Sequence, residues 1–132
     1  PHTLVWTGLR WHVRGWCEKN QDYRDFVLSR FRGEPEVLDA SDHTSASDEN
    51  WHTLVTIEIA PDPRLTIDQQ AVVAHDYGMT DGKWQLSVRA KLLPYLLQLL
   101  RLDPTQMMED PRAQQIVIVN QADVEAWLFP SG

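Results

Sequence analysis

The sequence lacks most features by which a secreted or membrane protein is recognised. Only one of its 132 residues is a cysteine, Cys17, so no internal disulfide can form, which fits a reducing compartment. No apolar run approaches the roughly 20 residues that a membrane-spanning helix needs. The chain starts at Pro1 without a signal-peptide pattern, so we expect a cytoplasmic protein, of which this chain is an excised part, with no membrane partner.

Motifs of enzymes and metal sites are missing as well. There is no glycine-rich phosphate loop, no G-x-S-x-G and no dinucleotide-binding fingerprint. The five histidines lack H-x-x-x-H spacing, and Cys17 has no second cysteine to complete a zinc site. Scattered carboxylates such as Glu58 and Asp62 show no spacing that singles out an acid–base pair. We therefore expect a protein that is not an enzyme, with no catalytic residue, no metal and no cofactor.

The charge that is present is unevenly distributed. The formal net charge is −7, from 12 Lys and Arg against 19 Asp and Glu. Residues 1–32 hold six Lys and Arg but three Asp and Glu, a net of +3, which leaves −10 for the remaining residues. An anionic ligand is therefore attracted to the first part of the chain and repelled by the rest.

This basic first part alternates between polar and apolar residues, as strands with one buried face do. The pattern predicts strands at Thr3–Thr7, Arg10–Cys17, Tyr23–Phe31 and Glu34–Leu38, with a hairpin loop at Lys19–Asp22. Three or four strands are too few to close a barrel, so we expect an incomplete one. The remaining strands are either outside this chain or supplied by a partner chain.

The alternation also places basic residues on one side of these strands. Arg10, His12 and Arg14 share a face of the second strand, and Arg24 and Arg30 share a face of the third. Pairing of the two strands could gather the arginines into one basic surface. Aromatic rings that could stack on bases lie in the same strands: Trp16, Tyr23 and Phe26. Guanidinium groups bind phosphate with two hydrogen bonds, so this surface suits an anionic ligand. The alternative is that the arginines pair with nearby carboxylates on a solvated face.

The same residues resemble a WYL domain, a module of bacterial transcription regulators named for a Trp-Tyr-Leu triplet. The resemblance rests on the run Pro1–Val5, on Gly8–Cys17 and on Tyr23–Phe31. Trp11-His12-Val13 stands where the triplet is expected, so two of its three positions differ. This form is similar to regulators of phage-defence loci, including BREX-associated ones.

The resemblance implies a fold and a function for this part of the chain. WYL domains are similar to small Sm- or SH3-like barrels that sense ligands, binding nucleic-acid fragments or nucleotides through basic residues on these strands. By position, Arg14, Arg24 and Arg30 would bind such an effector, and Arg10 and His12 are further candidates. In this family an N-terminal winged helix-turn-helix outside this chain would bind the operator DNA.

A change of composition marks a boundary in the middle of the chain. Residues 39–50 are small, polar and acidic, as in a flexible, solvated linker. We therefore expect the C-terminal part of a WYL domain in residues 1–38, a linker in residues 39–50 and a second domain in residues 51–132.

The second domain is predicted to alternate strands and helices. Thr66 and Gln69 match the capping box that starts a helix, and Asp81-Gly82 suits a tight hairpin. The predicted order is a strand at His52–Ala60, a helix at Ile67–His75, strands at Tyr77–Thr80 and Lys83–Arg89, a helix at Ala90–Arg101, a loop at Asp103–Arg112, a strand at Ile116–Val119, and a helix at Gln121–Leu128 capped by Asn120. This is a ferredoxin-like β-α-β-β-α-β arrangement with a terminal helix. It resembles the WCX extension of WYL-domain regulators.

These observations predict an α+β protein, with an incomplete Sm/SH3-like β-barrel followed by a ferredoxin-like domain and a terminal helix. We expect the sensing and dimerising region of a bacterial transcriptional regulator. It would form a homodimer and bind a nucleic-acid fragment or a nucleotide, including a cyclic one, as effector. The alternative is a structural dimerisation or protein-interaction module with no small-molecule or nucleic-acid ligand.

Overall fold

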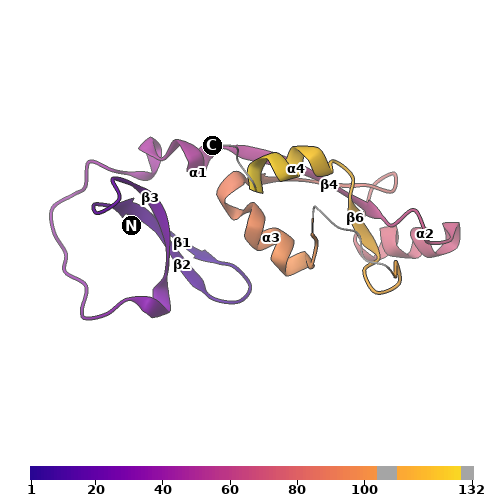
Figure 1. Ribbon diagram of the computed structural model, residues 1–132, viewed down its shortest axis with the longest axis horizontal. Coiled ribbons are helices and arrows are strands. Elements are labelled where there is room, and N and C mark those ends of the chain that lie inside the picture. The colour runs from indigo at the N-terminus through magenta and orange to yellow at the C-terminus, as the bar shows by residue number, and fades with distance from the viewer. Residues whose placement is uncertain (104–109, 129–132) are drawn as a thin grey trace. The chain divides into compact units, whose positions relative to one another are not determined.

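A computed structural model describes residues 1–103 and 110–128, and the chain divides into two units, Pro1–His52 and Thr53–Gly132 (Figure 1). Each unit contains a three-stranded antiparallel sheet, and the helices lie mostly in the second unit. Within the described residues neither sheet closes into a barrel. The predicted α+β class with an incomplete barrel is confirmed.

The sheet of the first unit consists of β1 (Thr3–Trp6), β2 (Trp11–Cys17) and β3 (Asp22–Val27), in the order β1-β2-β3. These are the first three predicted strands, but the third is shorter than expected. Leu28–Arg30 forms a single 3-10 turn, η1, in place of the end of that strand.

The predicted fourth strand at Glu34–Leu38 is absent from the structure. Gly33 has a positive φ of 74°, which turns the chain out of the extended conformation. Pro35 has no N–H to donate to a neighbouring strand. The prediction of a strand here was wrong because these two residues interrupt the alternating pattern.

Strand register divides the side chains of the first sheet between two faces. Leu4 pairs with Val13, and Val13 with Phe26, so these three side chains share one face, which we call the apolar face. Arg14 pairs with Asp25, so both project from the opposite face. Because side chains alternate along a strand, this second face also carries Trp16, Tyr23 and Thr3, and we call it the polar face.

Much of the predicted linker belongs to the first unit. A 3-10 turn, η2 (Ser45–Ser47), and a single turn of helix, α1 (Glu49–His52), follow the extended part of this segment. Asp48, which lies within the predicted linker of residues 39–50, and Trp51, just after it, are buried. His43, Ser47 and Asp48 of this segment contact side chains of the polar face.

The second unit has the ferredoxin-like strand order with one strand missing. Its central strand is β4 (Leu54–Pro61), flanked by β5 (Trp84–Arg89) and β6 (Ile116–Ile118), both antiparallel to β4. The strand predicted at Tyr77–Thr80 is reduced to a bridge between Thr80 and Lys83. Gly78, with a φ of 64°, breaks the extended conformation that a strand there would need.

Helices cover one face of this second sheet. They are α2 (Ile67–Asp76), the 3-10 turn η3 (Ala90–Leu92), α3 (Leu93–Leu100) and α4 (Gln121–Leu128). Alternate residues of β4 are buried, and they pack with residues of all three α-helices in one cluster: Val55, Ile57, Ile59, Val73, Leu93, Leu97 and Val124. The leucine-rich helix is therefore largely core. None of the helices in the described ranges is long and apolar enough to cross a membrane.

Local sequence signals in the second unit have the expected structures. Thr66 Oγ1 accepts a hydrogen bond from the Gln69 N–H, and the Gln69 side chain accepts one from the Thr66 N–H, which completes the capping box of α2. Asp81 and Gly82 both have positive φ, as a tight hairpin turn requires. Of the predicted loop at Asp103–Arg112, residues 104–109 lie outside the described ranges.

Asn120 precedes α4 as predicted, and its side chain bonds to the backbone of β4. Its Oδ1 accepts a hydrogen bond from the Glu58 N–H at 2.9 Å, and its Nδ2 donates to the Thr56 carbonyl oxygen at 2.8 Å. The side-chain amide therefore takes the place of a peptide group and extends the pairing of β4 beyond the end of β6.

Candidate functional site

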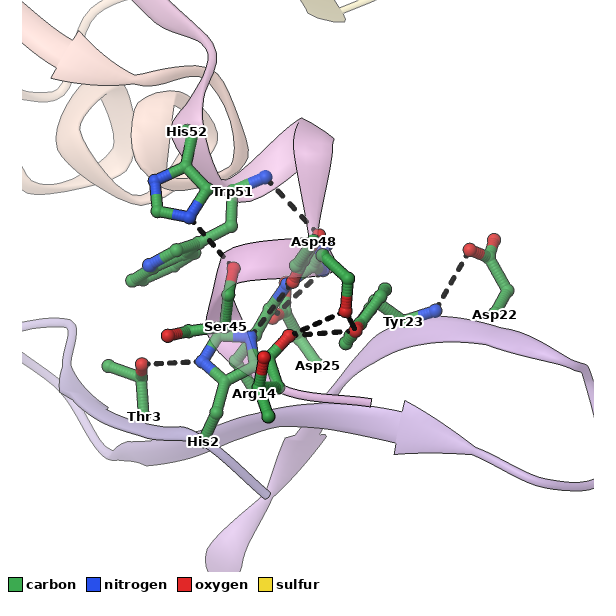
Figure 2. Close-up of polar contacts among 12 residues, drawn as sticks. His2, Thr3, Arg14, Asp22, Tyr23, Asp25, Ser45, Asp48, Trp51 and His52 are labelled. Atoms are coloured by element: carbon green, nitrogen blue, oxygen red, sulfur yellow. Dashed lines mark hydrogen bonds and ion pairs between the residues drawn. The ribbon is translucent and has the colours of Figure 1, made fainter. Parts of the chain in front are cut away.

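A buried ion pair lies at the centre of the polar face. Arg14, in the middle of β2, donates from Nε to Asp48 Oδ2 at 2.8 Å and from Nη2 to Asp48 Oδ1 at 2.9 Å (Figure 2). Arg14 is 2% exposed and Asp48 1% exposed. A second carboxylate, Asp25 of β3, lies with its Oδ1 3.4 Å from Arg14 Nη1. The guanidinium thus holds a carboxylate by the two-bond geometry that it also uses for phosphate.

Further groups converge on the Asp48 carboxylate. His2 Nε2 lies 2.9 Å from Asp48 Oδ2, and the other ring nitrogen of His2 lies 2.6 Å from Thr3 Oγ1 (Figure 2). The Trp51 N–H donates to Asp48 Oδ1 at 3.3 Å. Both oxygens of this buried carboxylate therefore have partners, as a buried charge requires.

The surroundings shift the pKa values of both members of the pair. Burial alone raises the pKa of Asp48, but the hydrogen bonds from Arg14 and His2 outweigh it, so the pKa lies below the ordinary value. Burial alone lowers the pKa of Arg14, but the hydrogen bond and charge of Asp48 and the charge of Asp25 raise it above the ordinary value. Both groups therefore carry their charges at neutral pH.

Two aromatic residues of the polar face contact the same segment as Arg14 does. The imidazole of His43 stacks on Trp16, with ring centroids 3.7 Å apart and planes 2° from parallel. Tyr23 Oη donates to the Thr44 carbonyl oxygen at 2.8 Å and hydrogen-bonds with Ser47 Oγ at 2.6 Å. Residues 43–48, which we call the strap, therefore lie across Trp16, Tyr23 and Arg14.

One polar atom of this face lacks a partner. Within the described residues, Trp16 Nε1 is buried and has no hydrogen-bond acceptor. An unpaired buried donor costs about 1–3 kcal/mol. The strap therefore covers the polar face without satisfying all of its groups.

The structure separates the residues that the sequence placed in one site. Arg14 and His12 are both buried on the polar face. Arg24 pairs with Gly15, which puts it on the apolar face, where it is exposed. Arg30 is exposed in η1, and Arg10 is exposed before the start of β2. The prediction that the four arginines form one basic surface was wrong, because alternation within each strand leaves open which residues of two strands pair.

Sequence analysis missed the partners that complete the polar face. Asp48 is 34 residues from Arg14, and it was assigned to a linker together with His43. Trp16 and Tyr23 were recognised as rings that could stack, but nothing in their spacing identified His43 or Ser47. Composition describes such a segment as solvated, and only the fold brings it to the sheet.

The apolar face carries a groove of its own. It has a volume of about 700 Å³, and its apolar lining includes Leu4, Val13, Leu28 and Phe31. Trp6 and Trp11 lie on the same face and are 55% and 47% exposed. Apolar side chains exposed together in this way are typical of a surface that contacts other protein.

No group of three or more histidine, cysteine, aspartate or glutamate side chains in residues 1–103 and 110–128 is arranged to hold a metal ion.

Each unit matches a known protein family, and the two matches together identify a transcriptional regulator. Residues 1–34 match the WYL domain. Residues 54–124 match the model described as BrxR transcriptional regulator, C-terminal dimerization domain. The chain belongs to this BrxR family, and a WYL domain precedes the dimerization domain. The predicted resemblance is confirmed.

Several relatives carry the name DNA-binding transcriptional repressor CapW. The relative from Stenotrophomonas maltophilia is 38% identical over 97% of this chain and 43% of its own length. One from Escherichia coli is 38% identical over 97% of this chain and 42% of its own length. One from Pseudomonas aeruginosa is 34% identical over 95% of this chain and 42% of its own length. The chain thus spans about two fifths of the length of these relatives, which are regulators and not enzymes.

Proposed function

We propose that this chain is the effector-sensing and dimerising part of a DNA-binding transcriptional repressor. The observation that carries the proposal is the similarity over nearly the whole chain, through both units, to proteins named as such repressors. Contact with operator DNA belongs to a region outside this chain, an N-terminal winged helix-turn-helix. The chain's own role is to hold two copies together and to sense an effector.

The effector is a nucleic-acid fragment or a nucleotide that binds the polar face. Arg14 supplies a planar pair of donors for a phosphate group, and His12 lies two positions away on the same face. Trp16 and Tyr23 supply rings on which bases stack, a contact worth about 1–3 kcal/mol per base. The exposed Arg10, Arg24 and Arg30 lie elsewhere on this unit, and their positive charges draw the anion toward it from a distance.

Effector binding changes operator affinity through the dimer. A ligand shifts an equilibrium between two dimer arrangements only by the difference in its affinity for them. The effector therefore binds one arrangement more tightly and favours or disfavours the form that holds DNA.

The dimer forms through the second unit. Leu99 of α3 is 59% exposed and Trp127 of α4 is 47% exposed, although both helices also contribute to the core. Large apolar residues exposed on neighbouring helices support a contact between two copies. Light scattering should give twice the mass of one chain. Leu99→Glu combined with Trp127→Glu should shift the mass toward one chain, whereas Ile67→Glu, at an exposed position of α2, should not.

Effector binding is tested by fluorescence anisotropy of a labelled short single-stranded DNA at two salt concentrations. We expect binding that weakens with salt, because phosphate contacts release counterions. Arg14→Lys keeps the charge but loses the two-bond geometry, and should weaken binding about tenfold. Arg24→Lys is the matched control on the apolar face and should change little. Equal effects of the two substitutions would contradict a site at Arg14.

A second candidate function is a structural dimerisation or protein-interaction module without such a ligand. The groove on the apolar face and the exposed Trp6 and Trp11 favour it. A stable dimer that binds no nucleic acid or nucleotide at low salt would support this function over the first.

A further inference from the structure

The strap makes three kinds of contact with the polar face, and each is a contact that nucleotides make with proteins. His43 is a planar ring stacked on an indole, at 3.7 Å. Asp48 is an anion held by two hydrogen bonds from a guanidinium. Ser47 is a hydroxyl bonded to the Tyr23 phenol, at 2.6 Å. A base, a phosphate and a sugar hydroxyl present the same three chemical groups.

These contacts hold the strap less firmly than an apolar core would. Of its residues only Asp48 is fully buried, and Thr44, Ala46 and Ser47 are exposed. A buried ion pair contributes little net stability because the desolvation of both charges offsets their attraction. Trp16 Nε1 gains no acceptor from the strap, whereas a base or a phosphate offers several.

We propose that the strap is an intramolecular competitor for the effector, occupying the site on the polar face until a ligand displaces it. The ligand class is a nucleotide or the end of an oligonucleotide, with its phosphate on Arg14 in place of Asp48 and its base on Trp16 in place of His43. This inference rests on the proposed function of the same face and assigns its regulation.

The strap lies directly before the segment that leads to the dimerization domain. Helix α1 follows directly after Asp48, and β4, the central strand of the dimerization domain, begins at Leu54. Release of the strap therefore removes the contacts of Asp48 at the start of the segment that joins the two units. Effector occupancy reaches the dimerization domain through the chain itself.

The first test measures the affinity of the full chain for a labelled short single-stranded DNA. Asp48→Asn removes the competing charge but keeps the size of the side chain, and should tighten binding about tenfold. Asp42→Asn is the matched control, since it removes one charge from an exposed residue just before the strap. Unlabelled mononucleotide and inorganic phosphate, added as competitors, show whether a base is required.

The outcomes separate this inference from the proposed function. Tighter binding by Asp48→Asn alone supports the strap as a competitor. If the wild-type chain binds the DNA and the two substitutions have the same effect on its affinity, the inference is overturned but the proposed effector site is not. Absence of binding by every variant would overturn the effector site and the inference together.

A second variant covers the case in which Asp48→Asn unfolds the first unit. His43→Ala removes the stacked ring and leaves the ion pair in place, so it too should tighten binding. Hydrogen-exchange mass spectrometry adds a direct measure of the strap. The amides of Ser47 and Asp48 donate within the strap, to Thr44 and Ser45, and should exchange faster when the DNA is added. Slower exchange there would mean that the ligand binds over the strap, and would overturn the inference.

Discussion

The two units of this chain are stabilised in different ways. In the second unit, Ile57, Ile59 and Leu93 are completely buried at the centre of an apolar cluster. In the described part of the first unit, the buried apolar residues are Val13 and Trp51, while Arg14 and Asp48 are buried as charges. The second unit therefore depends on an apolar core, and the first depends on a buried ion pair.

This difference suits the two proposed roles. Burial of apolar surface contributes about 25 cal/mol per Å² and does not depend on the identity of one partner. A buried ion pair contributes little net stability, but removing one member costs about 3–5 kcal/mol, because a buried charge is left unpaired. A dimerization domain benefits from the first property, and a sensing domain benefits from the second.

The largest effect is expected when the ion pair is broken. Arg14→Ala leaves the Asp48 carboxylate buried without its guanidinium, and should lower the free energy of unfolding of the first unit by about 3–5 kcal/mol. Hydrogen-exchange mass spectrometry should show fast exchange in β2 and β3 and unchanged exchange in β4. Arg14→Met with Asp48→Leu, which removes both charges, should restore most of the loss. If Arg14→Ala lowered the stability of both units to a similar extent, the two units would not be stabilised independently, and the comparison would fail.

A substitution in the apolar core should destabilise the second unit and leave the first unit unchanged. Ile57→Ala leaves a cavity under the helices and should lower the free energy of unfolding of the second unit by about 2–5 kcal/mol. The first unit should keep its exchange rates. Thr56→Ala, a neighbouring position on the exposed face of β4, is the control and should cost much less.

Acid should affect the first unit through Asp48. Because folding lowers the pKa of Asp48, its charge contributes stability above the ordinary aspartate pKa of about 3.9, and this stability is lost as the pH falls through the lowered value. The indole N–H signal of Trp16 in NMR spectra should report the loss. Asp62 in the second unit also has a lowered pKa, because of its hydrogen bonds with Arg64, so acid affects both units. The Asp48→Asn variant is therefore the control that isolates the contribution of Asp48. An identical acid profile in that variant would contradict the assignment.

The smallest effect is expected at the start of α2. Thr66→Ala removes the side-chain acceptor of the capping box and should lower the free energy of unfolding of the second unit by about 1 kcal/mol. Thr66→Ser keeps the acceptor and should cost less. Urea unfolding followed by circular dichroism measures both. A loss of stability as large as that of Ile57→Ala would contradict the prediction that the cap stabilises only the start of α2.

Sequence predicted those parts of the fold that local signals determine. The Thr66–Gln69 capping box and the Asp81-Gly82 turn each depend on residues within four positions of one another, and both are present. The predicted strands at Glu34–Leu38 and Tyr77–Thr80 failed because Gly33 and Gly78 adopt positive φ, which a pattern of apolar residues does not reveal.

The candidate site was predicted only in part. Arg14, Trp16 and Tyr23 were identified from one strand pair, but the alternation could not tell that Arg24 pairs with Gly15 and leaves this face. Asp48 lies 34 residues from Arg14, and no local rule connects the two. Long-range pairs of this kind come from the packing of a segment whose composition resembles a linker.

The short length of the strap determines how fast it would close again after displacement. Loops of about ten residues close in roughly 10–100 ns, which is far shorter than the lifetime of most bound ligands. In the mechanism proposed above, His43 and Asp48 would therefore return to the polar face before a second ligand arrives at low concentration. The proposed mechanism then predicts that the dissociation rate of the effector determines how long the polar face stays occupied, independently of earlier binding events.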